Sequence, residues 1–268
     1  MDDTIRNKIY TFVVETLKNQ FYDKRVKKLE GMTLTTLILR KCPYLLAAKT
    51  INNVNNLIKE AVDASLSSGD ETIFGDFIEQ VAVYVCEMTM GGHKSLVDGL
   101  DLEFEDASHY YIVSIKSGPN WGNASSVKKM HGYFAAAQRT LHTSNGSLRG
   151  KQVVCVEGCC YGNDENPFKP KSHHWKYCGQ RFWELISGGD SALYKDLMVP
   201  MLSQTQINDT NYTELYTTKL STLIQEFQGA YVTAEGAIDW EKYIEDNSGN
   251  QPPKPLKIVK PRRKKSKA

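Results

Sequence analysis

Two short stretches between residues 100 and 121 hold the side chains best suited to chemistry. The first stretch carries Asp101 and Glu103, and the second carries Ser114 and Lys116. Side chains alternate between the two faces of a β-strand, so the members of each pair share a face. If the two strands pair, carboxylates, a hydroxyl and an ammonium meet in one patch. Carboxylates bind hard cations such as Mg²⁺, and a lysine beside them can orient a water, which together suits metal-assisted phosphodiester hydrolysis. The same pattern is also common on solvated strand faces.

The segments that carry these residues are predicted to form a β-hairpin. Residues 100–104 and 110–121 alternate polar with apolar positions, and the second stretch is rich in aromatic and β-branched types. The polar connection over 105–109 is short enough to join paired strands. A valine-rich run over 151–160 is typical of a buried strand, and its place after a helix indicates a parallel or mixed sheet formed through a crossover.

Helices are expected on both sides of the hairpin. Apolar residues recur at helical spacing over 4–29, 54–66 and 72–88, and Ser67-Ser68-Gly69 is expected to separate the last two helices. The third of these helices carries Glu79 and Glu87. A glutamate on a helix is expected to face water unless other residues indicate a site beside it. After the hairpin, Asn123 or Ser125 can cap a helix that runs to about Leu141. Further helices are predicted over 179–188 and 192–227.

The order of these elements predicts four regions: a helical region over 1–70, an α/β core over 71–190, a helical region over 191–250 and a disordered basic tail over 251–268. The tail holds eight lysines and arginines and no acid. Removing those eight from the 33 basic residues leaves 25 against 31 acidic ones, so the rest of the chain carries a charge of −6. A detachable basic arm favours nucleic acid, and a solubilising end is the alternative.

The remaining composition narrows the class of protein. No apolar run is long enough to cross a membrane, and the N-terminus lacks a signal peptide, so we expect a soluble, cytoplasmic protein. The six cysteines show no disulfide framework, which fits a reducing compartment. A zinc site could be drawn from cysteines and histidines between 155 and 178. Its spacing matches no familiar zinc motif, and buried cysteines explain it more simply.

Several polar residues beyond the hairpin suit contact with DNA. Basic side chains lie along the helix after the hairpin, and the loop over 169–176 mixes basic with aromatic residues, although a solvated loop has the same composition. The candidate contacts are Asn120, Trp121, Asn123, Ser125, Lys128 and Lys171.

The stretches Phe74 to Glu79, Leu100 to Phe104 and Val113 to Gly122 stand in order along the chain, together with Cys42 to Leu45, Phe182-Trp183 and Gly236 to Trp240. Taken in this order, they resemble a type II restriction endonuclease of the PD-(D/E)XK nuclease superfamily. The resemblance covers most of the chain outside the basic tail. The central motif around Asp101 and Lys116 is weakly specific by itself, and the full set of motifs in this order is more specific. The resemblance implies an α/β restriction-endonuclease-like core, with a central mixed sheet flanked by helices and additional N- and C-terminal helices.

The resemblance implies a role for each matching residue. The metal-bridging aspartate of the family falls on Asp101, the motif lysine on Lys116, and the glutamate sent in from the first core helix on Glu79. The acid expected two residues before the lysine is replaced by Ser114, which brings no charge to a metal. Either Glu103, which shares a face with Asp101, supplies the missing carboxylate, or the site is inactive.

The implied activity is Mg²⁺-dependent, site-specific cleavage of double-stranded DNA that leaves a 5′-phosphate. Asp101, Glu103 and Glu79 would hold the metal, and Lys116 would position or help deprotonate the attacking water. The implied partners are a second copy of the chain and the cognate DNA methyltransferase of a restriction-modification system. An inactive DNA-binding protein on the same scaffold and a DNA repair or processing nuclease are the alternatives.

Overall fold

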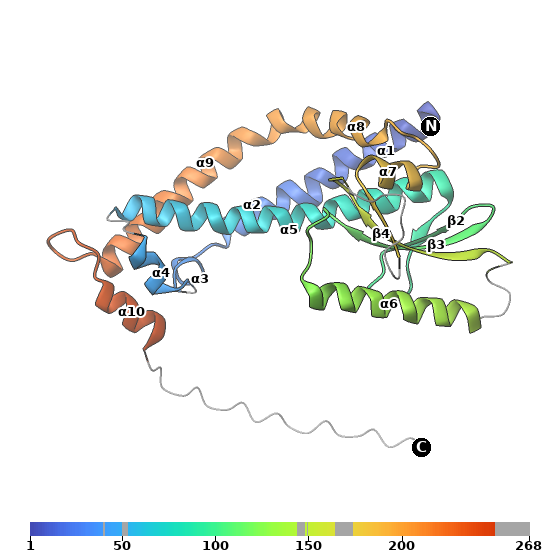
Figure 1. Cartoon of the computed structure of the whole chain (residues 1–268). Helices are drawn as coiled ribbons and strands as arrows, with labels where there is room; N and C mark the ends of the chain where they lie inside the picture. The colour runs from blue at the N-terminus through green and yellow to red at the C-terminus, as the bar shows by residue number, and fades with distance from the viewer. Residues whose placement is uncertain (40, 50–52, 144–147, 149, 164–173, 250–268) are drawn as a thin grey trace, which may run out of the picture. The chain divides into compact units, whose positions relative to one another are not determined.

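The computed structural model describes residues 1–39, 41–49, 53–143, 148, 150–163 and 174–249. The chain divides into two compact units, one made of residues 1–32 and 63–219 and the other of residues 33–62 with the chain from 220 onward. Two long helices, α5 (Val54–Met90) and α9 (Met198–Tyr231), run across this division (Figure 1). The basic tail lies outside the described residues.

The first unit is built on a mixed sheet of five strands in the order β1-β2-β3-β4-β5. β1 pairs with β2 and β2 with β3 in antiparallel fashion, whereas β3–β4 and β4–β5 are parallel. The hairpin, the crossover through a helix and the mixed α/β architecture predicted from the sequence are confirmed. The strands are β1 (His93–Lys94), β2 (Leu102–Glu105), β3 (His109–Lys116), β4 (Gln152–Cys159) and β5 (Trp175–Cys178).

Strand β5 was not predicted, because its residues were assigned to a basic loop. It is only four residues long, and its parallel partner β4 supplies the hydrogen bonds that hold it in the sheet. The preceding part of that loop, residues 164–173 with the candidate Lys171, lies outside the described residues.

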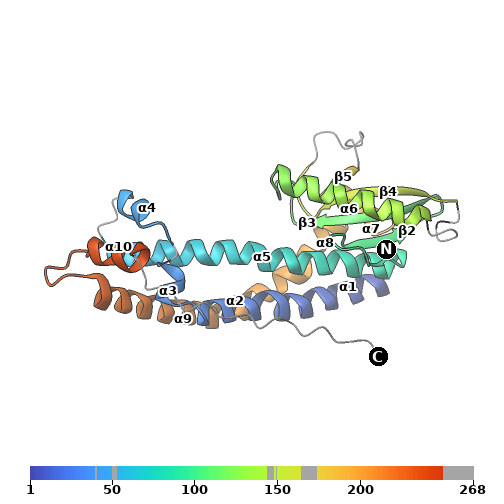
Figure 2. The same cartoon turned by 90° about the horizontal axis from the view of Figure 1, so that it is seen from below.

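Helices cover both faces of the sheet (Figure 1). On one face, α6 (Ala124–Thr143) packs Met130, Phe134 and Ala137 against Ile112 and Cys155. On the other face, α5 packs with α1 (Asp3–Thr16), α7 (Gln180–Ile186) and α8 (Leu193–Asp196) around the apolar side of the strands. Figure 2 shows α1 running beside α5. The buried side chains of this second cluster include Val13, Phe77, Val81, Val113, Val156, Phe182 and Trp183.

The helix predicted over residues 4–29 is confirmed as a nearly continuous element. It consists of α1, a π-helical segment η1 (Leu17–Tyr22) and α2 (Asp23–Glu30). The side chain of Asp2 accepts a hydrogen bond from the backbone N–H of Thr4, which satisfies one of the free donors at the start of α1.

The predicted helix break at Ser67-Ser68-Gly69 is wrong, because α5 continues through it. The side chain of Lys28 lies where a Cβ on Gly69 would stand, and its ammonium donates a hydrogen bond to the carbonyl oxygen of Ser65. A glycine inside a helix costs about 1 kcal/mol relative to alanine, and here its missing side chain makes room for this contact. The predicted region boundary at residue 70 therefore lies within a helix.

The second unit contains α3 (Leu34–Leu37), α4 (Pro43–Ala48), α10 (Trp240–Ser248) and the outer parts of α5 and α9. The fully buried Tyr243 donates its hydroxyl to the carbonyl oxygen of Ile38 at 2.9 Å. The amide of Asn247 donates to the carbonyls of Leu39 and Lys41, so α10 ties down the segment that follows α3. In the described part of the chain, no helix combines the length and apolar character needed to cross a membrane.

Candidate active site

Asp101 stands at the point where β2 begins, and its carboxylate is fixed by the neighbouring strand. The N–H of Asp101 donates to the carbonyl oxygen of Val113 at 2.9 Å, and the N–H of Ile115 donates to Asp101 Oδ2 at 2.6 Å. The hydroxyl of Ser114 lies 3.4 Å from the same oxygen. The side chain of Asp101 stays 19% exposed, which leaves its carboxylate open on one side.

Lys116 is the last residue of β3 and lies beside Asp101. Its Nζ is 3.7 Å from Asp101 Oδ2 and donates a hydrogen bond to the carbonyl oxygen of Ile115 at 2.8 Å. The same ammonium lies over the ring of Trp121, 4.9 Å from the ring centroid. The structure therefore brings together the two residues at the centre of the predicted motif.

Glu79 reaches the same region from α5. Burial raises the pKa of its carboxyl, the charge of Asp101 raises it further, and Lys94 and Lys116 oppose both effects. The buried thiol of Cys160 is influenced by the same three groups: burial raises its pKa, with Glu79 and Asp101 adding to the shift and Lys116 opposing it. Glu79, Asp101 and Lys116 thus share one electrostatic environment, because charges act on each other strongly only at short range.

Glu103 is placed differently from the other predicted metal ligands. Its side chain is buried, and each carboxylate oxygen accepts a hydroxyl hydrogen bond of 2.6 Å, one from Ser95 and the other from Tyr110. Burial and the hydrogen bond to Glu103 raise the pKa of Tyr110, so its hydroxyl remains a donor. Strand alternation predicted that Glu103 shares a face with Asp101, and in the structure each oxygen of its carboxylate already accepts one hydrogen bond.

The side chains near Asp101 suit a hard cation that keeps part of its water shell. Within the described ranges, no three His, Cys, Asp or Glu side chains converge closely enough to hold a metal ion by themselves, and this includes the cysteines considered for zinc. Mg²⁺ retains several waters and is commonly bound through one or two carboxylates together with substrate phosphates. The carboxylates of Asp101 and Glu79 are of the type that fits this requirement, and a cation would relieve the repulsion between them.

Sequence reasoning did not identify Glu157 of β4, a buried carboxylate close to the motif. Its Oε1 accepts hydrogen bonds from Trp121 Nε1 at 2.9 Å and from Lys176 Nζ at 2.8 Å, while its Oε2 lies 3.0 Å from His174 Nε2. A glutamate inside an otherwise valine-rich strand was the available signal, since an acid is rarely buried unless it is paired.

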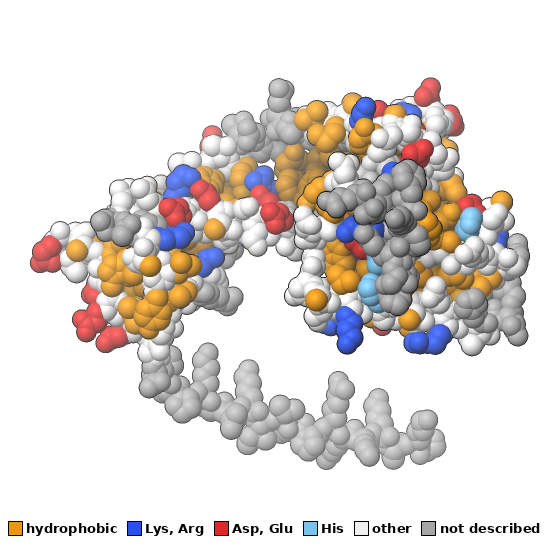
Figure 3. Space-filling view, viewed as in Figure 1, with side chains coloured by type: hydrophobic (Ala, Val, Ile, Leu, Met, Phe, Trp, Pro, Cys, Tyr) orange, Lys and Arg blue, Asp and Glu red, His pale blue; other side chains and the backbone are white. Residues whose placement is uncertain are grey.

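The candidate DNA contacts differ in their exposure. Asn120, Ser125 and Lys128 are exposed, and Asn123 is exposed while its side chain caps α6 by accepting from the N–H of Ser126 at 3.0 Å. Trp121 is turned inward, with its indole N–H on Glu157. The loop over 169–176 was predicted to suit DNA contact, but two of its residues, His174 and Lys176, point inward to Glu157. Figure 3 shows lysine and arginine side chains along α6, where Lys128, Lys129 and Arg139 are exposed.

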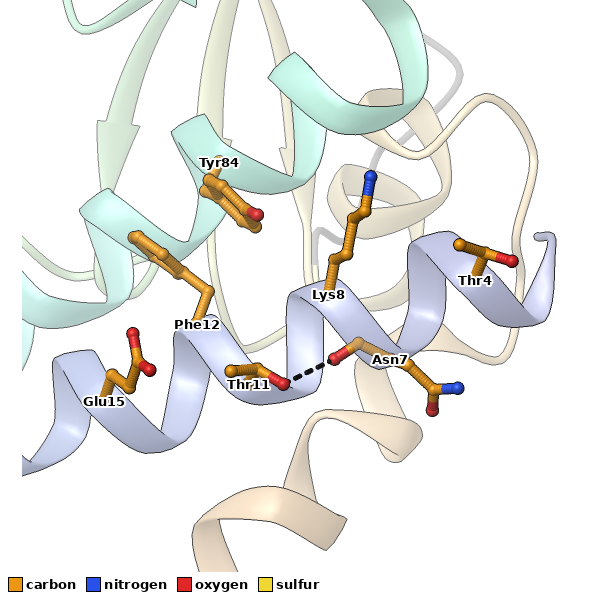
Figure 4. Close-up of a pocket in the computed structure, with 7 residues that line it drawn as sticks. All are labelled: Thr4, Asn7, Lys8, Thr11, Phe12, Glu15 and Tyr84. Atoms are coloured by element: carbon orange, nitrogen blue, oxygen red, sulfur yellow. Dashed lines mark hydrogen bonds between the residues drawn. The ribbon is translucent and has the colours of Figure 1, made fainter.

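Two pockets lie beside α1 on the first unit. The first, shown in Figure 4, contains the stacked rings of Phe12 and Tyr84, 3.9 Å apart, and a single carboxylate, Glu15. The second pocket shares both rings and adds Glu79, Glu87 and Lys94, so it reaches one carboxylate of the candidate site. The first pocket is lined by Thr4, Asn7, Lys8, Thr11, Phe12, Glu15 and Tyr84.

The family model described as "Type II restriction endonuclease EcoO109I" matches residues 7–209, about three quarters of the chain. The chain belongs to this restriction endonuclease family. The matched region runs from α1 into α9 and contains every candidate catalytic residue. A search of curated proteins found no match.

Family membership confirms the resemblance stated from the sequence motifs. The five-stranded mixed sheet with flanking helices is consistent with the PD-(D/E)XK-like α/β fold. This restriction endonuclease is therefore placed among the site-specific DNA endonucleases, and its reaction is that of a nuclease.

Proposed function

We propose that this restriction endonuclease cleaves double-stranded DNA with Mg²⁺ at a site formed by Asp101, Glu79 and Lys116. The observation that carries the proposal is the placement of Lys116 Nζ 3.7 Å from Asp101 Oδ2, on an aspartate fixed by the N–H of Ile115. The electrostatic influence of Asp101 and Lys116 on Glu79 supports its inclusion. Glu103 becomes the second choice for a metal ligand, because both of its oxygens already accept hydroxyl groups.

Each residue has a distinct role in the proposed reaction. Asp101 and Glu79 would hold Mg²⁺, which when bound lowers the pKa of a water and neutralises charge on the scissile phosphate. Lys116 orients the attacking water and, as a fixed positive charge, stabilises the negative charge that develops on the non-bridging phosphate oxygens. The N–H of Ile115 keeps Asp101 in place throughout, so this carboxylate needs no reorganisation before the reaction.

Ser114 motivates the rival proposal of an inactive DNA-binding protein on the same scaffold. It stands where an acid is expected, is 1% exposed, and offers only a hydroxyl to Asp101. Our proposal meets this objection with Glu79, a carboxylate from α5 on which both Asp101 and Lys116 act, which would serve as a second protein ligand for Mg²⁺.

The proposed partners follow from the site and the family. Exposed Asn120, Ser125 and Lys128 lie near the end of β3 and the start of α6, where they suit base and phosphate contacts to double-stranded DNA. We further propose that the protein is a homodimer, since a DNA sequence with two-fold symmetry is matched by two copies of one chain. We also propose a cognate DNA methyltransferase as its partner in a restriction-modification system. Sedimentation at micromolar concentration that shows only monomer, with and without DNA, would count against the dimer.

The proposal is tested by digesting a long DNA of known sequence in the presence of Mg²⁺. We expect discrete fragments with 5′-phosphate ends from the wild type, and none from Asp101→Asn or Lys116→Ala, while both variants still bind DNA. Asp106→Asn is the matched control, because Asp106 accepts the N–H groups of Ser108 and His109 at the other end of the same hairpin.

The outcomes separate the three functions. Cleavage by Asp101→Asn at the wild-type rate would contradict the assignment of the site. Binding without cleavage by the wild type would indicate the inactive DNA-binding protein. A continuous smear in place of bands would indicate a processing nuclease.

A further inference from the structure

The carboxylate of Glu157 is the centre of a buried polar cluster beside the candidate site. In the sheet register Glu157 lies between Ser114 of β3 and Lys176 of β5. Although burial alone would raise its pKa, hydrogen bonds from His174, Lys176 and Trp121 lower it to about 2. Glu157 is thus a buried carboxylate that stays negatively charged at neutral pH. Most of its capacity to accept hydrogen bonds is used by side chains of the protein.

These contacts argue against Glu157 as a replacement for the acid missing at Ser114. A metal ligand must offer an oxygen lone pair. Three donors share Oε1 of Glu157, namely the indole of Trp121, the ammonium of Lys176 and, at 3.8 Å, the thiol of Cys159. His174 Nε2 lies 3.0 Å from Oε2, so most of the accepting capacity of the carboxylate is used. Breaking the contact with Lys176 would leave a largely buried ammonium without its partner, which is strongly unfavourable. These contacts suit a structural role in which Glu157 holds the side chains of Trp121 and Lys176 in place.

Trp121 connects this cluster to the candidate active site. Its indole N–H donates to Glu157, and its ring face lies under the ammonium of Lys116, 4.9 Å from the ring centroid. The ring packs among the apolar residues on the α6 side of the sheet. The hydrogen bond at the N–H and the apolar packing together fix the position of the Trp121 ring. The face of an aromatic ring carries partial negative charge, so the fixed ring attracts the ammonium of Lys116.

The backbone between Lys116 and Trp121 is held by the same cluster. Lys176 Nζ, which pairs with Glu157, also donates to the carbonyl oxygen of Pro119 at 3.0 Å. The ring of Pro119 lies where a Cβ on Gly162 would stand, and Gly162 has a positive φ of 92°. The turn that follows Lys116 is therefore fixed at Pro119 as well as at Trp121.

We propose that Trp121 and Glu157 are positioning residues that hold the ammonium of Lys116 beside Asp101. Glu157 fixes the indole, the indole face holds the ammonium, and the ammonium is thereby kept within 4 Å of Asp101. The catalytic consequence rests on the proposed function, whereas the placement of Lys116 can be measured without any cleavage. This assignment gives Trp121 a role inside the protein instead of the base contact considered from its position in the sequence.

The direct test measures how readily each lysine is acetylated in the folded protein, followed by peptide mass spectrometry. In Trp121→Leu, which loses the ring face, we expect acetylation of Lys116 to accelerate about threefold to thirtyfold, the range that cation–π attraction supports. Trp121→Phe keeps a ring but loses the N–H and should give a smaller increase. Lys176 should be unaffected in both variants. In Glu157→Gln, both Lys116 and Lys176 should react faster.

Trp183→Phe is the matched control for these variants. Its indole also donates a buried hydrogen bond, to the carbonyl of Cys160 at 2.8 Å, but it packs on the α5 side of the sheet. Lys151, paired with Glu105 at 3.0 Å, provides an internal reference in every sample. Unchanged reactivity of Lys116 in both Trp121→Leu and Glu157→Gln would overturn the proposal, as would an equal increase in Trp183→Phe.

A kinetic measurement then tests the consequence for cleavage. We expect Trp121→Leu to lower the single-turnover rate at least about tenfold, while the dissociation constant for DNA changes less than about twofold, because positioning acts on the chemical step. A loss confined to DNA binding would show that Trp121 contacts DNA and would overturn the positioning role. If the wild type does not cleave, the proposed function fails, and the acetylation result still decides whether Trp121 and Glu157 hold Lys116.

Discussion

The most informative perturbation compares two isosteric changes, Glu79→Gln and Glu103→Gln. Both residues were candidates for the carboxylate that Ser114 does not supply. In the structure, Glu79 lies in the field of Asp101 and Lys116, whereas Glu103 accepts hydroxyl groups from Ser95 and Tyr110. We expect Glu79→Gln to abolish most cleavage and Glu103→Gln to lower stability with little loss of cleavage.

The magnitudes follow from these environments. Loss of a metal-binding carboxylate removes at least about 3 kcal/mol of charge stabilisation in the transition state, which is more than about a hundredfold in rate. The same change removes repulsion with Asp101, so the free energy of unfolding in EDTA should stay constant or rise. For Glu103→Gln, the exchange of two charged for neutral hydrogen bonds costs about 1 kcal/mol, or about 2–4 °C in Tm.

The assay pairs single-turnover cleavage in Mg²⁺ with thermal unfolding in EDTA for both variants and the wild type. Glu79→Gln should lose cleavage rate and keep its Tm, whereas Glu103→Gln should lose Tm and keep most of its cleavage rate. The reasoning is refuted if Glu79→Gln cuts at the wild-type rate while Glu103→Gln loses cleavage without a change in Tm. That result would return the metal-ligand role to Glu103.

Three further predictions concern the surroundings of the site. Glu157 has a pKa of about 2 in the folded protein, below its ordinary value, so its stabilisation is complete above about pH 4.5 and is lost as the pH falls towards 2. The difference in unfolding free energy between wild type and Glu157→Gln, up to about 3 kcal/mol, should therefore shrink between pH 6 and pH 3, and a constant difference would contradict it. Gly158→Ala would drive a Cβ into the ring of buried Phe182, which we expect to cost about 1–3 kcal/mol in urea unfolding; an unchanged midpoint would show that the core yields. Ser114→Glu places a second, buried carboxylate next to Asp101, so the Tm of this variant should fall in EDTA and recover when Mg²⁺ is added. Equal recovery with Na⁺ at the same ionic strength would exclude a specific effect of the metal.

Much of the core was determined by local sequence patterns. Alternation along residues 100–104 and 110–116 predicted the hairpin, and the valine-rich run before Cys160 predicted a parallel strand after a crossover helix. Because strand periodicity fixes which side chains share a face, the meeting of Asp101 and Lys116 was predictable once the two strands were assumed to pair. The start of α6 was equally predictable, since Asn123 satisfies its own helix terminus.

Tertiary structure decided which partner each charged side chain takes. Alternation assigns Glu103 to a face, but it does not reveal that Ser95 and Tyr110 donate to both of its oxygens. Glu157 was hidden for the same reason, since its donors come from the turn after β3 and from the segment around β5. Such contacts join residues far apart along the chain, whereas periodicity reports only on neighbours within one element. The sequence therefore predicted that Asp101 and Lys116 meet, and the packed structure decided that Glu103 is held by two hydroxyl groups and that Trp121 faces inward to Lys116.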